Sequence, residues 1–174
     1  MGGATASSWT AEGARMRIII DTREQRPYRF PDGVETVRQA LVAGDYSVEG
    51  LEDEIAVERK SLADAYGTFG RGRARFIREL DRLTQVRYAA VVVEADLATA
   101  LFTPPVHSRL SPRSFNRSWI AWSVRTGIHF LFCGSRELAE RETFLLLQRA
   151  WLDHAARVQT APIPVPSTQH ARGE

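Results

Sequence analysis

The chain has 174 residues, of which 44% are hydrophobic and 25% charged, values typical of a globular protein long enough to bury one core. No apolar run approaches the roughly 18 residues of a membrane-spanning helix, and the single cysteine, Cys133, excludes an internal disulfide and a thiolate-rich zinc site. The net charge of +2 is too small to identify a nucleic-acid-binding protein by itself.

Composition at the two ends predicts one folded domain between two tails. Residues 1–15 are rich in Gly, Ala, Ser and Thr without periodicity, and the end of the chain carries three prolines at alternate positions. We therefore expect disordered tails at 1–15 and 159–174 and a single domain at 16–158. Because the N-terminus has no export signal, we expect a soluble intracellular protein of the cytoplasm or nucleoid that makes no membrane contact.

Apolar runs and capping residues predict alternating strands and helices. Short β-branched or apolar runs predict strands at 17–21, within 33–41, at 88–94 and at 128–133. Helices are predicted from Ser61 to Tyr66, over 73–86 with the stripe Phe76, Ile77, Leu80 and Leu83, from Ser111 through Thr126 with Phe115, Trp119 and Trp122 on one core face, and from Ser135 to about Arg157. This alternation predicts an α/β fold with a central mixed sheet flanked by helices.

Residues 44–60 carry the most specific pattern, two alternating runs around a turn-prone GLED stretch. Placing Glu49 opposite Glu54 closes an antiparallel hairpin and pairs Tyr46 with Val57. One face of the hairpin is then consistently apolar, as a half-buried pair of strands requires. The same register decides which side chains share the other face.

That other face brings Asp45 opposite Glu58, with Lys60 two residues further along. Like charges directly opposite one another destabilise a sheet, and a divalent cation removes the conflict. Mg²⁺ and Mn²⁺ bind one or two carboxylates together with water and phosphate. The pattern predicts a Mg²⁺ or Mn²⁺ site, with Lys60 placed to orient or deprotonate the attacking water or to offset charge in the transition state.

Two further features of the sequence support phosphate chemistry. Lys60 is the only lysine among 23 basic residues, which indicates a role that a guanidinium cannot fill. The segment 71–87 holds six arginines and two acids. It predicts DNA contacts by Arg71, Arg73, Arg75 and Arg78. A solvated helix face is the alternative reading of such a charge run.

Asp21 and Glu24 follow the first predicted strand and complete the acidic cluster if that strand neighbours the hairpin. Arg23, between them, would then face phosphate. For each acid alone, a turn or strand-end role is the alternative.

Three motifs in their order and spacing, DTRE at 21–24, GDY at 44–46 and VERKxxxD at 57–64, resemble the nuclease domain of the XPF family. These are structure-specific DNA endonucleases of the PD-(D/E)xK superfamily, with a restriction-endonuclease-like fold. The resemblance covers about residues 17–94 and includes GRGR at 70–73 and FIREL at 76–80. It implies that the site acids are Asp21, Glu24, Asp45 and Glu58, that Asp21, Asp45 and Glu58 bind the metal, and that Arg23, Arg59 and Lys60 serve the catalytic centre.

The resulting hypothesis is a Mg²⁺-dependent or Mn²⁺-dependent DNA endonuclease that acts on branched or structured DNA in repair or recombination. The alternatives are a catalytically silent subunit that binds DNA or a partner, and a nuclease directed at RNA. Eukaryotic and archaeal XPF relatives add tandem helix-hairpin-helix domains, whereas this sequence ends after the nuclease region. We therefore expect a stand-alone nuclease domain that works as a homodimer or with a DNA-targeting partner protein.

Overall fold

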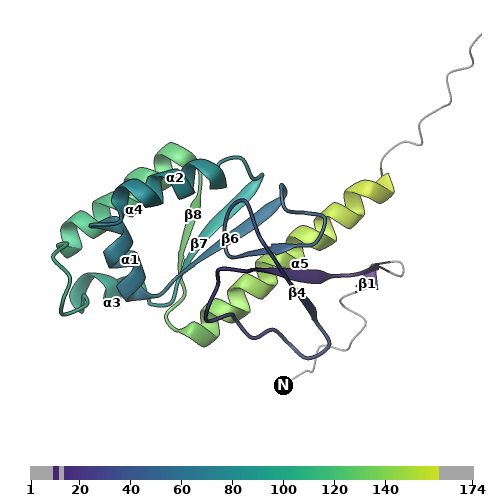
Figure 1. The fold of residues 1–174 in the computed structure, drawn as a ribbon, viewed down its shortest axis with the longest axis horizontal. Coiled ribbons are helices and arrows are strands. Elements are labelled where there is room, and N and C mark those ends of the chain that lie inside the picture. The colour runs from purple at the N-terminus through teal and green to yellow at the C-terminus, as the bar shows by residue number, and fades with distance from the viewer. Residues whose placement is uncertain (1–9, 12–13, 161–174) are drawn as a thin grey trace, which may run out of the picture.

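The computed structural model describes residues 10–11 and 14–160 (Figure 1). Most of the two predicted tails lies outside the described residues. Within the predicted tail at 1–15, β1 (Thr10–Ala11) and β2 (Ala14–Arg15) pair as short antiparallel strands. At the other end, the last helix extends to Thr160, into the predicted tail at 159–174. The boundaries of the domain therefore stay a prediction.

A six-stranded mixed sheet forms the centre of the molecule, in the order β4-β3-β5-β6-β7-β8. Its strands are β3 (Arg17–Asp21), β4 (Glu35–Gln39), β5 (Tyr46–Val48), β6 (Ile55–Lys60), β7 (Tyr88–Val93) and β8 (His129–Phe132). The strand β5 is antiparallel to both β3 and β6, whereas β6, β7 and β8 run parallel to one another. The predicted α/β class and mixed sheet are confirmed.

Helices cover both faces of the sheet (Figure 1). They are α1 (Leu62–Phe69), α2 (Arg73–Leu83), α3 (Leu97–Phe102), α4 (Pro112–Thr126) and α5 (Arg136–Thr160). The first four enclose one apolar core, which includes Phe69, Phe115 and Trp122, and α5 closes a second core that includes Tyr46 and Val57. Among the described helices, none is both long and apolar enough to span a bilayer.

Local signals explain the helix boundaries. The hydroxyl of Ser61 accepts a hydrogen bond from Asp64 N and begins α1, and Ser111 caps α4 in the same way. The prediction for α2 was wrong at Ile77, which is 40% exposed, because only a narrow stripe of this helix faces the core. The six-residue α3 was not predicted; Asp96 caps it.

Candidate active site

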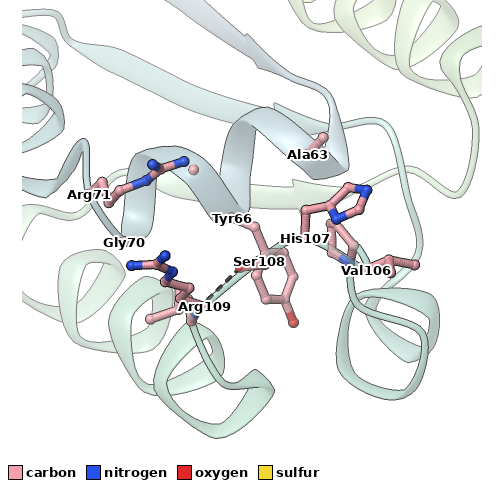
Figure 2. A pocket seen from close by; sticks show the side chains of 11 residues that line it. Ala63, Tyr66, Gly70, Arg71, Val106, His107, Ser108 and Arg109 are labelled. Atoms are coloured by element: carbon pink, nitrogen blue, oxygen red, sulfur yellow. Dashed lines mark hydrogen bonds between the residues drawn. The ribbon is translucent and has the colours of Figure 1, made fainter.

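Two hollows border α1. One, of about 680 Å³, lies between α1 and the loop that joins α3 to α4 (Figure 2). The other, of about 230 Å³, lies where β6 ends and α2 passes over the sheet. Glu58 and Lys60 line this smaller hollow together with Arg75, Phe76 and Glu79. Two of the predicted catalytic residues of β6, Glu58 and Lys60, therefore face one solvent-accessible space.

The hairpin that carries these residues has the predicted register where β5 and β6 meet, since Tyr46 pairs with Val57. The ladder does not continue to a pair between Asp45 and Glu58, however. The amide of Asp45 donates to Val57 O at 2.8 Å, and the Asp45 carboxylate accepts from Arg59 N at 2.7 Å. Two residues thus oppose Val57, as in a β-bulge, which corrects the predicted cross-strand pair.

Asp45, Glu58 and Lys60 nevertheless form one electrostatic cluster. The ammonium of Lys60 bonds the Glu58 carboxylate and lies 5.3 Å from the centre of the Phe76 ring. Burial and then the neighbouring Glu58 raise the pKa of Asp45, and burial raises the pKa of Glu58. Burial alone would lower the pKa of Lys60, but the charge and hydrogen bond of Glu58, together with the charges of Asp45 and Asp64, outweigh burial and raise the pKa. Ionisation of both carboxyl groups would place more negative charge in the cluster than one ammonium offsets, and an added cation would stabilise that ionised form.

Asp21 lies beside this cluster, but its carboxylate is occupied by hydrogen bonds to other residues. Its side chain is 1% exposed and accepts hydrogen bonds from Leu41 N and from the backbone and guanidinium of Arg23. Burial raises the pKa of Asp21, but these hydrogen bonds outweigh burial and lower it. The Arg23 side chain is 66% exposed and interacts electrostatically with Asp45. Asp21 thus holds an arginine at the edge of the site.

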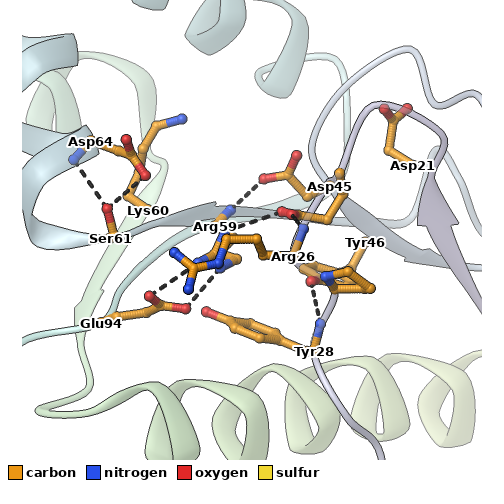
Figure 3. Close-up of polar contacts among 12 residues, drawn as sticks. Asp21, Arg26, Tyr28, Asp45, Tyr46, Arg59, Lys60, Ser61, Asp64 and Glu94 are labelled. Carbon is orange, nitrogen blue, oxygen red and sulfur yellow. Dashed lines mark hydrogen bonds and ion pairs between the residues drawn. The ribbon is translucent and has the colours of Figure 1, made fainter.

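Arg59 and Glu24 belong to a different layer. Because side chains alternate along a strand, Arg59 points to the face of β6 opposite Glu58, where it contacts Glu94, Glu24 and the ring of Tyr28 (Figure 3). Its guanidinium meets Glu94 through two hydrogen bonds, of 2.7 and 3.1 Å. The structure places this network directly beneath the site, on the α5 side of the sheet.

Two acidic residues that were not predicted from the sequence, Glu94 and Glu79, make hydrogen bonds to the elements that carry the site. Glu94 follows β7, and its amide donates to Lys60 O, so it lies beside the end of β6. Glu94 could have been identified from the sequence, because 88–94 was predicted as a strand and the ends of neighbouring parallel strands lie at the same edge of a sheet. Glu79, on α2, accepts a hydrogen bond from Gly44 N at 3.2 Å. Nothing local in the sequence indicates that contact.

Gly44 allows the close approach that places Asp45. Its φ is +75°, and a Cβ there would meet Val57 O at 3.1 Å. We expect Gly44→Ala to lower the free energy of unfolding by about 2 kcal/mol or more, as measured by chemical denaturation. Gly33→Ala is the control, because Gly33 has a φ of +86° but a Cβ there would have no atom of the described residues within 4 Å. Equal losses in the two variants would contradict a role for the close approach.

The four predicted DNA-binding arginines lie in different surroundings. Arg75 lines the hollow of Glu58 and Lys60, and Arg71 lines the larger hollow. Arg78 is exposed on α2. Arg73 instead donates to Ser118 Oγ at 2.8 Å and lies 4.6 Å from the Trp122 ring centre, so it ties α2 to α4.

The acidic side chains of the site suit a divalent cation that takes few protein ligands. Among the residues that the structure describes, no group of three or more His, Cys, Asp or Glu is arranged to hold a metal ion. Mg²⁺, however, commonly binds through one or two carboxylates, with water and substrate phosphate as the other ligands. The adjacent carboxylates of Asp45 and Glu58, both with raised pKa values, fit that pattern.

The mixed six-stranded sheet flanked by helices, with Glu58 and Lys60 on its central strand β6, has a restriction-endonuclease-like fold. The chain belongs to the ERCC4 domain family, whose model matches residues 20–141. The structure of XPF from Aeropyrum pernix matches with a TM-score of 0.60 and 22% identity, covering 82% of this chain and 68% of that one. The same XPF in complex with DNA matches with a TM-score of 0.58 and 25% identity, covering 88% and 69%. A comparison with curated proteins gives no match. The predicted resemblance to the XPF family is confirmed.

Proposed function

We propose that this protein is a metal-dependent endonuclease that hydrolyses phosphodiester bonds in branched or structured DNA. The observation that carries the proposal is the cluster of Asp45, Glu58 and Lys60, in which two carboxyl groups of raised pKa lie near one ammonium and Glu58 and Lys60 line one hollow. Arg75 on the wall of that hollow provides a cation for phosphate. The likeness to an XPF structure in complex with DNA supports DNA as the substrate.

In this proposal Asp45 and Glu58 hold Mg²⁺ or Mn²⁺. Such an ion, when bound, polarises a phosphoryl oxygen and lowers the pKa of a coordinated water. Lys60 remains an ammonium because its pKa is raised, so it offsets negative charge in the transition state rather than deprotonating water. Asp21 is occupied by Arg23 and Leu41, and we assign it the task of orienting Arg23 toward the phosphate.

Replacing either proposed metal ligand tests the assignment. We expect Asp45→Asn and Glu58→Gln to lower the cleavage rate of plasmid or branched DNA with Mg²⁺ by about a hundredfold or more. DNA binding in EDTA should stay equal or become tighter, because each change removes a negative charge near the phosphate. Cleavage by the wild-type protein should need Mg²⁺ or Mn²⁺.

Asp53→Asn and Glu137→Gln are matched controls, since both side chains are exposed and away from the hollow. They should cut at the wild-type rate. Robust cutting in excess EDTA, or full activity of Asp45→Asn, would refute the metal assignment. Binding without cutting on single-stranded, duplex, flap, fork and four-way substrates would instead favour a silent subunit, and faster cutting of matched RNA would favour an RNA nuclease.

A further inference from the structure

The larger hollow beside α1 carries cations without matching acids. Arg71 lines it from the turn after α1, and His107 and Arg109 line it from the loop that joins α3 to α4; among the described residues, no Asp or Glu lines it. In the view of Figure 2, Arg71 and Arg109 lie on one side of the hollow and His107 on the other. Two guanidinium groups in one hollow repel each other unless an anion lies between or beside them.

Neither Arg71 nor Arg109 has a side-chain hydrogen bond or ion pair with a described residue. Other arginines of the chain are engaged: Arg59 bonds Glu94, Arg136 bonds Glu140, and Arg73 bonds Ser118. Both free arginines are exposed, so their donors are available to a ligand. Guanidinium groups with unused donors are typical phosphate contacts.

The hollow adjoins the candidate active site. Gly67 lines both hollows, and a Cβ built on Gly67 would meet no atom of the described residues within 4 Å, so the surface is uncrowded at that point. Only Ser61 separates the end of β6, with Lys60, from α1. A strand whose scissile phosphate lies at Lys60 can therefore continue past Gly67 toward Arg71.

The size and lining of the hollow indicate whether it suits single-stranded or double-stranded nucleic acid. Its volume of about 680 Å³ lies within the range of small-ligand sites, which are about 300 to 1,000 Å³, so it suits an unpaired nucleotide or two rather than a double helix. Pro105 and Leu110 line it, and the lining Val106 is 92% exposed. Apolar surface and an imidazole ring provide contacts for unpaired bases, and the arginines provide contacts for the backbone.

We propose that this hollow, the strand pocket, binds an unpaired stretch of the DNA strand next to the phosphate that is cut. The inference rests on the proposed function and makes it more specific. Arg71 and Arg109 contact phosphates, and the 105–110 loop contacts bases.

The test compares Arg71→Ala/Arg109→Ala with the control Arg29→Ala/Arg141→Ala, two exposed arginines that line a hollow on the α5 side. Fluorescence anisotropy in EDTA would measure affinity for a labelled 12-residue oligo-dT and for a blunt duplex. We expect the first variant to lose about tenfold or more in affinity for oligo-dT and less than about threefold for the duplex, and the control to lose neither. The slope of log affinity against log salt for oligo-dT should become shallower by about 1.4, which corresponds to two phosphates.

Equal losses on oligo-dT and duplex, or no loss on either, would overturn the strand pocket. So would a loss of affinity confined to oligo-U, measured in the same assay, which would assign the pocket to RNA. Circular dichroism melting would verify that both variants are folded. Because the binding assay contains no metal, it judges the pocket even if the wild-type protein cuts no DNA, an outcome that would refute the proposed function alone.

Discussion

Lys60→Arg is expected to lower the cleavage rate by about a hundredfold or more, while the protein still folds and binds DNA. The ammonium of Lys60 lies in a narrow space between the Glu58 carboxylate and the Phe76 ring. A guanidinium keeps the charge but is broad and planar, so it cannot place a compact positive charge at the same point. The measurement is single-turnover cleavage of a branched DNA with Mg²⁺, alongside DNA affinity in EDTA.

The control is Arg141→Lys, an exposed cation exchange on α5, which should be nearly silent. Thermal melting separates a chemical effect from a packing effect, because the larger side chain also has to fit beside Phe76. A Lys60→Arg protein that is folded and cuts at close to the wild-type rate would show that only the charge matters. The scarcity of lysine in the sequence would then have no chemical meaning.

Local patterns in the sequence predicted the part of the site that lies within one hairpin. Side chains alternate between the two faces of a strand, so Glu58 and Lys60, two residues apart, were predicted on the same face of β6. The predicted register, with Tyr46 opposite Val57, put that face opposite the apolar one. The same reasoning missed the bulge at Asp45. At that bulge Gly44 N donates to Glu79, which lies on another element, α2.

Contacts between distant elements explain the other differences. Arg73 and Arg75 are two residues apart in one basic run, yet Arg73 packs on Trp122 and Arg75 lines the hollow. Only the orientation of α2 against the sheet separates these roles, and charge density along the sequence does not encode it. The helix α3 was not predicted, because its six residues are too few to show a helical period in the sequence.

The ion pairs of Arg59 are expected to stabilise the fold far more than pairs on the surface. The side chains of Arg59, Glu24 and Glu94 are 9%, 7% and 10% exposed, so Arg59→Ala leaves carboxylates buried without their main partner. We expect a loss of about 3 kcal/mol in the free energy of unfolding, measured by urea denaturation. Arg149→Ala breaks a pair with Asp153 whose side chains are 74% and 45% exposed, and should cost less than about 1 kcal/mol.

A second measurement separates this structural role from the catalytic one that the family resemblance implies for Arg59. Removing Glu94 as well should restore part of the stability, because the double variant Arg59→Ala/Glu94→Ala no longer buries the carboxylate that lost its partner. If Arg59 acts only beneath the site, cleavage per folded molecule of this double variant should stay within about tenfold of wild type at a temperature where it is folded. A hundredfold loss in fully folded protein would instead assign Arg59 to the chemistry, acting through the β6 backbone whose Arg59 N bonds Asp45.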